Sequence, residues 1–212
     1  MKKALSVVIV LAVIAGLALF VFRTPVKEAI YDGITADMFV PADTDSFDPG
    51  PAVGSSFPGV RALYQGQEIS LLNSLTGTNG TVLVASRSLD WCPFCMKQMI
   101  QLNTHKEDFD AAGIAVIGIT YDSPALLDKF AAQHAITLPL LSDIEVMTFK
   151  TLGIVNAEYT AGDDAYGIPY PGMIVIDPDG IVVGKLFLEG YSTRVDSLAA
   201  LAFAKQVLAV TP

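Results

Sequence analysis

The sequence has few of the residues that bind metals or nucleic acids. It contains 2 cysteines, 2 histidines and 13 Lys and Arg against 22 Asp and Glu in 212 residues. Residues 29–212 hold 9 of the basic residues and 21 of the acidic ones. Nucleic-acid binding requires a basic face, so this composition argues against it. It also argues against close binding of this region to anionic lipid, and the acidic excess is sufficient for solubility.

Charge is absent from Ala4 to Phe22, a run of apolar residues whose only hydroxyl belongs to Ser6. As a helix rising ~1.5 Å per residue it would span roughly 28 Å, close to the ~30 Å core of a bilayer. A cleaved signal peptide has a shorter apolar region of roughly 7–15 residues and small residues at its cleavage site, whereas this run ends in the bulky "LALFVFRTP". We therefore expect residues 1–28 to form a retained single-pass membrane anchor. Lys2 and Lys3 favour an extracytoplasmic (periplasmic) position for the rest of the chain.

A turn-rich stretch follows the expected anchor. Tyr31–Ser56 contains five aspartates, no basic residue and several prolines and glycines, with no hydrophobic periodicity. This composition is typical of a linker. We expect residues 29–56 to form an acidic flexible tether and residues 57–212 to form one domain.

Strand and helix patterns alternate within this domain. Thr81–Ser86 and Ile114–Tyr121 are nearly continuous apolar runs, typical of buried parallel strands. Ser123 and Pro124 are the expected N-cap and first residue of a helix. Further strands are expected at 68–72, 173–177 and 181–187, and helices at 92–112, 123–134, 145–152 and 193–210. Such alternation, with a terminal hairpin, predicts an α/β domain with a mixed sheet.

Both cysteines lie in "SLDWCPFCMKQM", Ser88–Met99. A structural zinc site needs four ligands, and His105 and His134 lie outside the usual spacing of such sites, so no metal is predicted. A disulfide that closes so short a loop removes little entropy from the unfolded chain, so stability does not explain the pair. A redox dithiol does explain it.

The spacing of the pair suits thiol–disulfide exchange. Cys92 falls at the expected N-cap of a helix after a buried strand, and Pro93 falls at the first helical position, where its missing N–H costs nothing. The helix N-terminus favours the Cys92 thiolate, and Cys95 lies one turn further in. We expect Cys92 to be the exposed nucleophile and Cys95 the buried resolving cysteine. No metal or organic cofactor is required.

The longer pattern resembles a known family. The segments "RSLDWCPFCMKQM", "GITYDSP", "FAAQHAITLPLLSD" and "GIPYPGMIVIDPDGIVV" resemble the alkyl hydroperoxide reductase/thiol-specific antioxidant branch of the thioredoxin superfamily, the peroxiredoxin-like redoxins. The resemblance covers about residues 53–187. It implies a thioredoxin-like fold, with a mixed central sheet flanked by helices and the redox centre at the first turn of a helix.

The sequence departs from the peroxiredoxin motif that it resembles. With Cys95 at the position of the peroxide-reacting cysteine, the motif's threonine falls on Cys92 and its proline on Ser88. The family's later arginine falls on Pro171. A proline at that place resembles the cis-proline of thioredoxins, so we expect a cis Tyr170–Pro171 peptide beside the sulfurs. Arg87 is then the candidate cation near the site.

Several neighbours are candidates for supporting roles. Trp91, Pro93 and Pro171 are expected to line a substrate groove, although a half-buried aromatic and an ordinary loop proline are the plainer interpretations of Trp91 and Pro171. Tyr121 and Asp122 end a strand on the side where sites form in α/β sheets.

The sequence therefore predicts a membrane-anchored thiol–disulfide oxidoreductase that acts on protein or small-molecule disulfides and needs a recycling thiol or disulfide partner. One alternative is a peroxiredoxin-like thiol peroxidase that reduces hydroperoxides, with one cysteine forming a sulfenic acid and the other resolving it. Another is a non-catalytic tethered binding module, for which both thiols would be dispensable.

Overall fold

The computed structural model describes residues 27, 29–41, 46–70, 72 and 75–210. The chain divides into two compact units, Met1–Asp37 and Met38–Pro212. In the first unit residues 29–34 are helical, and the Thr35 hydroxyl donates to the Tyr31 carbonyl at 2.7 Å. The predicted anchor, Ala4–Phe22, lies outside the described residues. Within the described part of the chain, no helix has both the length and the apolarity needed to cross a bilayer.

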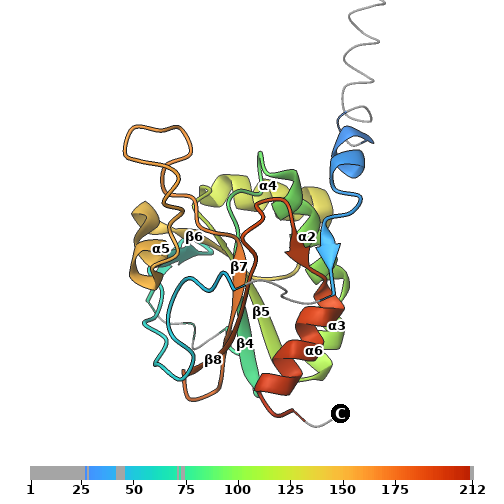
Figure 1. The fold of residues 1–212 in the computed structure, drawn as a ribbon, viewed down its shortest axis with the longest axis vertical. Coiled ribbons are helices and arrows are strands. Elements are labelled where there is room, and N and C mark those ends of the chain that lie inside the picture. The colour runs from blue at the N-terminus through green and yellow to red at the C-terminus, as the bar shows by residue number, and fades with distance from the viewer. Residues whose placement is uncertain (1–26, 28, 42–45, 71, 73–74, 211–212) are drawn as a thin grey trace, which may run out of the picture. The chain divides into compact units, whose positions relative to one another are not determined.

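A seven-stranded sheet in the order β3-β2-β6-β5-β4-β7-β8 forms the centre of the second unit (Figure 1). Its three central strands run parallel, and β2, β7 and β8 pair antiparallel to their neighbours. The predicted mixed sheet is therefore confirmed. The strands are β2 (Ala62–Tyr64), β3 (Gln67–Ile69), β4 (Gly80–Ala85), β5 (Ile114–Thr120), β6 (Leu140–Asp143), β7 (Gly172–Ile176) and β8 (Val182–Phe187).

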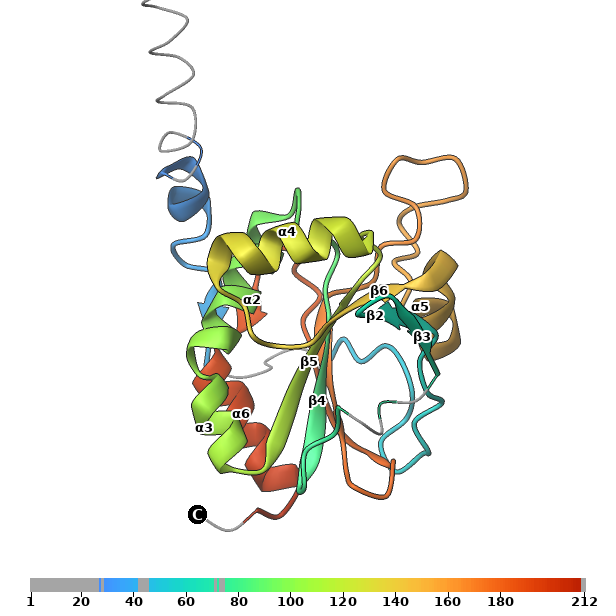
Figure 2. The same ribbon diagram turned by 180° about the vertical axis from the view of Figure 1, so that it is seen from behind.

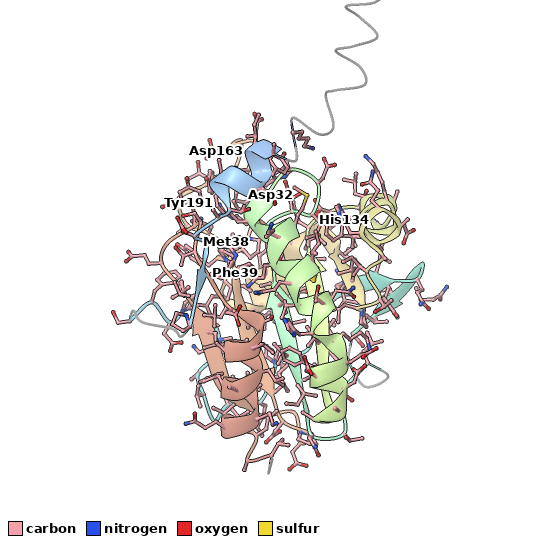
Figure 3. All side chains as sticks on the ribbon, turned by 90° about the vertical axis from the view of Figure 1, so that its right-hand side faces the viewer. Asp32, Met38, Phe39, His134, Asp163 and Tyr191 are labelled. Atoms are coloured by element: carbon pink, nitrogen blue, oxygen red, sulfur yellow. A yellow bond between two sulfur atoms is a disulfide. The ribbon has the colours of Figure 1, made fainter. Side chains whose placement is uncertain are left out.

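Helices cover both faces of this sheet (Figure 2). Along β4, Val82 and Val84 face one hydrophobic core and Leu83 faces the other, because successive side chains of a strand point to opposite faces. The first core also contains residues of α2 (Pro93–Thr104), α3 (Lys106–Ala111), α4 (Pro124–His134) and α6 (Ser197–Val207), and the second contains residues of α5 (Met147–Leu152). Figure 3 shows α6 alongside α2 and α3.

The helix predicted over 92–112 is divided into two. His105 ends α2 with φ −100° and ψ 14°, values outside the helical region, and α3 begins at Lys106. The His105 ring contacts the Asp108 carboxylate at 3.0 Å, which fixes the first turn of α3. The break lets Phe109 turn into the core, where it is fully buried. By contrast, the predicted start of α4 is confirmed, with Ser123 at the N-cap and Pro124 at the first position.

Part of the stretch predicted to be a flexible tether is ordered. β1 (Phe39–Val40) pairs in parallel with β9 (Arg194–Val195), just before α6. Further along, the buried Lys185 ammonium lies 2.8 Å from an Asp48 carboxylate oxygen, and the Gly54 amide donates to the Val182 carbonyl at 2.7 Å. The folded unit therefore begins at Met38 rather than at residue 57. Composition missed this segment because its partners lie far along the chain.

Candidate redox site

Cys92 and Cys95 form a disulfide at the start of α2. Cys92 is the N-cap residue, with φ −96° and ψ 101°, and its sulfur accepts a hydrogen bond from the Cys95 amide at 3.3 Å. Pro93 occupies the first helical position. The strand β4 leads directly to this segment, so the redox pair lies at the carboxyl end of a central parallel strand. The predicted helix start is confirmed.

The two sulfurs are both buried in the disulfide form. Cys92 is 2% exposed and Cys95 is 0% exposed. The expectation that Cys92 is exposed is therefore wrong for this form of the protein. The physical reason is packing: both cysteines belong to the hydrophobic core on the α2 face, together with Leu89. Both sulfurs are therefore shielded from solvent in the disulfide form.

Arg194 is the charged side chain at the sulfurs, and sequence reasoning missed it. Its Nη2 lies 3.6 Å from the Cys95 sulfur, and Nη1 donates to the carbonyls of Tyr191 at 2.9 Å and Thr193 at 2.6 Å. Among the described residues no carboxylate forms an ion pair with it. Burial, together with repulsion from Arg87, lowers the pKa of Arg194 to about 9. A cation this poorly compensated is a site for a negative charge.

Arg87, the cation expected from the sequence, contacts Tyr191 and not a sulfur. Its guanidinium donates to the Tyr191 carbonyl and lies 5.2 Å from the centre of the Tyr191 ring. Burial lowers the pKa of Arg87, while Tyr159, Tyr191 and Glu158 act in the opposite direction. Figure 3 places Tyr191 at the end of the domain where α2 begins. Both arginines therefore hold the same carbonyl, and only Arg194 touches a sulfur.

A small cavity lies beside Arg194. Gln98, Pro171, Thr193 and several apolar side chains line it, and it has room for about one water molecule. Gln98 Oε1 and Arg194 Nε are buried and make no hydrogen bond to any other described group of the protein. Gln98 lies one helical turn from Cys95 on α2. Both residues line the cavity, so one acceptor and one cationic donor without partners belong to its wall residues.

The predicted cis peptide before Pro171 is wrong. The peptide bond between Tyr170 and Pro171 is trans, and the described residues contain no cis peptide bond. The Tyr170 amide donates to the Ile154 carbonyl at 2.8 Å, which holds this stretch extended as it enters β7. Pro171 still borders the cavity beside Arg194, so the sequence placed the proline near the site but assigned it the wrong geometry.

Trp91 and Tyr121 are joined across the loop before Cys92. The Trp91 indole N–H donates to the Tyr121 hydroxyl at 2.9 Å, and Trp91 is 43% exposed. Burial raises the pKa of Tyr121, although the bond from Trp91 opposes this. Next to Tyr121, the buried Asp122 carboxylate accepts hydrogen bonds from the same loop. These contacts place both residues in support of the loop rather than at a sulfur.

The described residues contain no group of three or more His, Cys, Asp or Glu side chains that could hold a metal ion. The reactive groups within the described ranges are the two cysteines. The arrangement can form and break one buried disulfide, with a cation fixed against one of its sulfurs.

Comparison with known proteins agrees with this site. Residues 53–185 match the model of the AhpC/TSA family. The chain is 28% identical over 130 residues to alkyl hydroperoxide reductase E of Mycobacterium tuberculosis, covering 61% of this chain and 81% of that protein. It is 30% identical over 121 residues to peroxiredoxin Bcp of Xanthomonas campestris, covering 55% and 74%.

Solved structures share the fold. The crystal structure of peroxidoxin BcpB from M. tuberculosis has a TM-score of 0.61 and 21% identity, and the match covers 76% of this chain and 97% of that one. A peroxiredoxin-like protein from Aquifex aeolicus has a TM-score of 0.63 and 18% identity over 76% and 90% of the two chains. The family match spans more than half of the sequence and contains both cysteines, so this chain belongs to the AhpC/TSA family and is a peroxiredoxin-like redox protein with a Cys92–Cys95 dithiol.

Proposed function

We propose that the protein is a thiol peroxidase, in which Cys95 reacts with a hydroperoxide and Cys92 resolves the product. The observation that carries the proposal is the 3.6 Å contact between the Cys95 sulfur and the buried, otherwise uncompensated Arg194 guanidinium. Similarity to proteins called alkyl hydroperoxide reductase and peroxiredoxin supports the same assignment. The roles of the two cysteines are then the reverse of those expected from the sequence.

The electrostatics favour Cys95 as the thiolate. Two opposite unit charges at that contact attract by about 5 kcal/mol at an effective dielectric constant of ~20. Burial of Cys95 acts against ionisation, but a neighbouring cation commonly lowers a pKa by ~1–3. Reduction of the disulfide therefore supplies the anion that Arg194 lacks in the oxidised form.

The chemical steps balance without a cofactor. The Cys95 thiolate attacks one peroxide oxygen, the O–O bond breaks, and the released alkoxide takes a proton to leave as an alcohol, or as water when the substrate is hydrogen peroxide. Cys95 is now a sulfenic acid. The Cys92 thiol attacks this sulfur, water leaves, and the Cys92–Cys95 disulfide forms. Two electrons from an external thiol partner restore the dithiol by exchange.

The cavity beside Arg194 suits the head of a hydroperoxide. Arg194 Nε can donate to a peroxide oxygen, and Gln98 Oε1 can accept its O–H. Because the space holds only about one water molecule, a hydroperoxide enters it only when the lining side chains shift, and hydrogen peroxide, the smallest, requires the smallest shift.

Single-cysteine variants test this proposal. In the Cys92→Ser variant, hydrogen peroxide should convert Cys95 to a sulfenic acid that a dimedone-type reagent traps. In the Cys95→Ser variant, Cys92 should not form this product at a comparable rate. Absence of peroxide-dependent labelling at Cys95 in the reduced Cys92→Ser protein would contradict the proposal.

Disulfide exchange is the second candidate, and the position of Cys92 favours it. The Cys92 sulfur at the N-cap accepts the Cys95 amide, and free helix N–H groups stabilise a thiolate there. The exposed Trp91 and the trans Pro171 beside the site would then border a groove for protein or small-molecule disulfides. In this case the Cys95→Ser variant traps mixed disulfides through Cys92, and peroxide turnover is negligible.

We also propose that the N-terminal run anchors the redox domain on the extracytoplasmic side of a membrane. The support is the uncharged Ala4–Phe22 segment and the two lysines before it. External protease should digest the domain in spheroplasts, and the membrane-extracted protein should keep its first residues. A mature N-terminus near residue 25 would contradict the anchor.

A further inference from the structure

We propose that Ser88 and Asp122 position Cys92 for the resolving step. Their contacts, called here the Ser88–Asp122 latch, hold the loop from Ser88 to Trp91 against the end of β5. The consequence for peroxide chemistry rests on the function proposed above, but the positioning itself concerns formation of the Cys92–Cys95 disulfide and can be tested without peroxide.

The Asp122 carboxylate is the fixed half of the latch. It is 6% exposed and lies two residues after the end of β5, next to Tyr121. One oxygen accepts the Ser88 hydroxyl at 2.8 Å, and the other accepts the Leu89 amide at 2.6 Å and the Thr120 hydroxyl at 3.0 Å. All three partners are donors, so the ionised carboxylate, which only accepts, is the form that satisfies them.

Ser88 connects the Asp122 carboxylate to the residues before Cys92 through hydrogen bonds. Its hydroxyl gives its single proton to Asp122 and accepts the amides of Asp90 at 3.0 Å and Trp91 at 3.3 Å. One donor bond and two acceptor bonds use the full capacity of a hydroxyl group. The backbone amides of three consecutive residues, Leu89 to Trp91, are thus bound directly or indirectly to one carboxylate.

The far side of the latch is attached to the sheet. The Ser142 hydroxyl, at the carboxyl end of β6, donates to the Asp122 carbonyl at 2.6 Å, and the Trp91 indole reaches the neighbouring Tyr121 hydroxyl. Cys92 is the next residue after this loop and only caps α2, whereas Cys95 lies inside the first turn of α2 and touches Arg194. Loss of the latch should therefore loosen Cys92 and leave Cys95 in place.

Freedom of Cys92 matters because the resolving step competes with a second oxidation. The Cys95 sulfenic acid can react with the Cys92 thiol, which releases water and forms the disulfide. It can instead react with another hydroperoxide, which gives a Cys95 sulfinic acid and an alcohol or water. The effective concentration of a neighbouring group depends steeply on how well it is held, so a looser loop favours the second oxidation.

Two variants remove the latch and two matched variants control for it. Ser88→Ala removes the hydroxyl, and Asp122→Asn places an N–H₂ group where only acceptors fit. Ser86→Ala deletes an equally buried hydroxyl that has no hydrogen-bond partner among the described groups. Asp143→Asn alters an equally buried carboxylate that instead accepts the Thr148 and Phe149 amides at the start of α5.

The first measurement is the equilibrium of the dithiol with reduced and oxidised glutathione. In both latch variants we expect the effective concentration of the Cys92–Cys95 pair to fall about tenfold, and in both controls to stay within about twofold of wild type. Ser88→Thr, which keeps the hydroxyl, should recover the wild-type value. If Asp122→Asn does not fold, Ser88→Ala with its Ser88→Thr rescue decides the question. An unchanged equilibrium in Ser88→Ala would overturn the proposal.

The second measurement separates the latch from the peroxidase assignment. Stopped-flow fluorescence of Trp91, the sole tryptophan, follows oxidation of the reduced full-length protein by hydrogen peroxide, and mass spectrometry measures Cys95 sulfinic acid against peroxide dose. We expect the latch variants to reach half overoxidation at about tenfold lower peroxide while the first step keeps its rate. If wild type does not react with peroxide, the peroxidase assignment fails and the glutathione result still decides the latch. If the first step is normal and overoxidation does not change, the latch proposal fails alone.

Discussion

Replacement of Arg194 by methionine tests the electrostatic basis of the site. Methionine fills a similar volume without charge. In the oxidised protein Arg194 is 2% exposed, and its guanidinium lies against a neutral disulfide sulfur. The difference between its pKa of about 9 and the ordinary value of 12.5 corresponds to a cost of about 5 kcal/mol for keeping this charge buried in the folded, oxidised protein.

The reduced protein recovers part of that cost. A Cys95 thiolate at the same distance supplies an attraction of the same order, about 5 kcal/mol at a dielectric constant of ~20. In Arg194→Met this attraction is lost, so the pKa of the Cys95 thiol should rise by ~1–3. The fraction of thiolate at pH 7, and with it the rate of the first step with hydrogen peroxide, should fall by about tenfold for each unit by which the pKa of the variant thiol lies above both 7 and the wild-type value.

The assay uses rates across a pH series. Stopped-flow oxidation of reduced wild type and Arg194→Met should show a large difference at pH 7 that narrows at alkaline pH, where both thiols ionise. A purely structural defect would lower the rate by a similar factor at every pH. Denaturant unfolding of the oxidised proteins should show the variant to be no less stable than wild type. Removal of the charge removes the cost of burying it, and this gain offsets the lost hydrogen bonds to the carbonyls.

The matched control is Lys185→Met, which removes another buried cation that touches neither sulfur. Lys185 is 9% exposed and pairs with Asp48. The rate at which reduced Lys185→Met reacts with hydrogen peroxide in the first step should equal that of wild type within about twofold. An Arg194→Met protein that keeps the wild-type rate at pH 7 would refute the role assigned to Arg194 and would favour Cys92 as the first cysteine to react.

Three further predictions concern stability. The Lys185 ammonium also donates to the Asp48 and Pro49 carbonyls. In Lys185→Met, the free energy of unfolding should therefore fall by about 1–2 kcal/mol, and residues 46–56 should become more sensitive to limited proteolysis. An unchanged cleavage pattern would contradict this. In Gly172→Ala the added carbon would approach Phe187 Cδ1 to 2.2 Å, so overpacking should lower stability by about 1–3 kcal/mol, which thermal unfolding would detect as a lowered Tm. Burial raises the pKa of Asp143 above its ordinary 3.8, although the hydrogen bonds to its carboxylate act in the opposite direction. The contribution of this pKa shift to stability is therefore fully present below pH 3.8 and is lost as pH rises through the raised pKa. Asp143→Asn should remove this part of the pH dependence, and a difference in unfolding free energy between variant and wild type that stays constant from pH 4 to 7 would refute the assignment.

Local signals in the sequence were sufficient for the start of α2. A β-branched apolar run followed by Cys-Pro predicts a buried strand and a helix whose N-cap is Cys92, because both features depend on residues within a few positions of one another. The hairpin of β7 and β8 was predictable for the same reason: "PDG" lies between two apolar runs, and the Asp177 carboxylate accepts the amides of Asp179 and Ile181.

Contacts between distant segments were not predictable. Arg194 lies 99 residues from Cys95 along the chain, and no periodicity distinguishes it from a solvated arginine before the last helix. The β1–β9 pair consists of two residues on each strand, too short to give an alternating pattern. The peptide before Pro171 was predicted to be cis by analogy alone, and only the tertiary structure fixes it as trans.

The two cysteines receive different stabilisation, and this difference underlies the order of reaction proposed above. The helix N-terminus favours charge on Cys92 by about 0.3–1 kcal/mol, or up to ~2 kcal/mol in a partly buried setting. Arg194 favours charge on Cys95 by about 5 kcal/mol before the cost of burying the thiolate is subtracted. It also attracts a charge on Cys92, the disulfide partner of Cys95, so only the difference between the two attractions, which is smaller than about 5 kcal/mol, favours Cys95 over Cys92. That cost applies to both sulfurs, because both are almost completely buried, so it does not reverse the order. Helix position alone would give the thiolate to Cys92, whereas the contact between Arg194 and the Cys95 sulfur acts in the opposite direction and is the reason for the order of reaction proposed above.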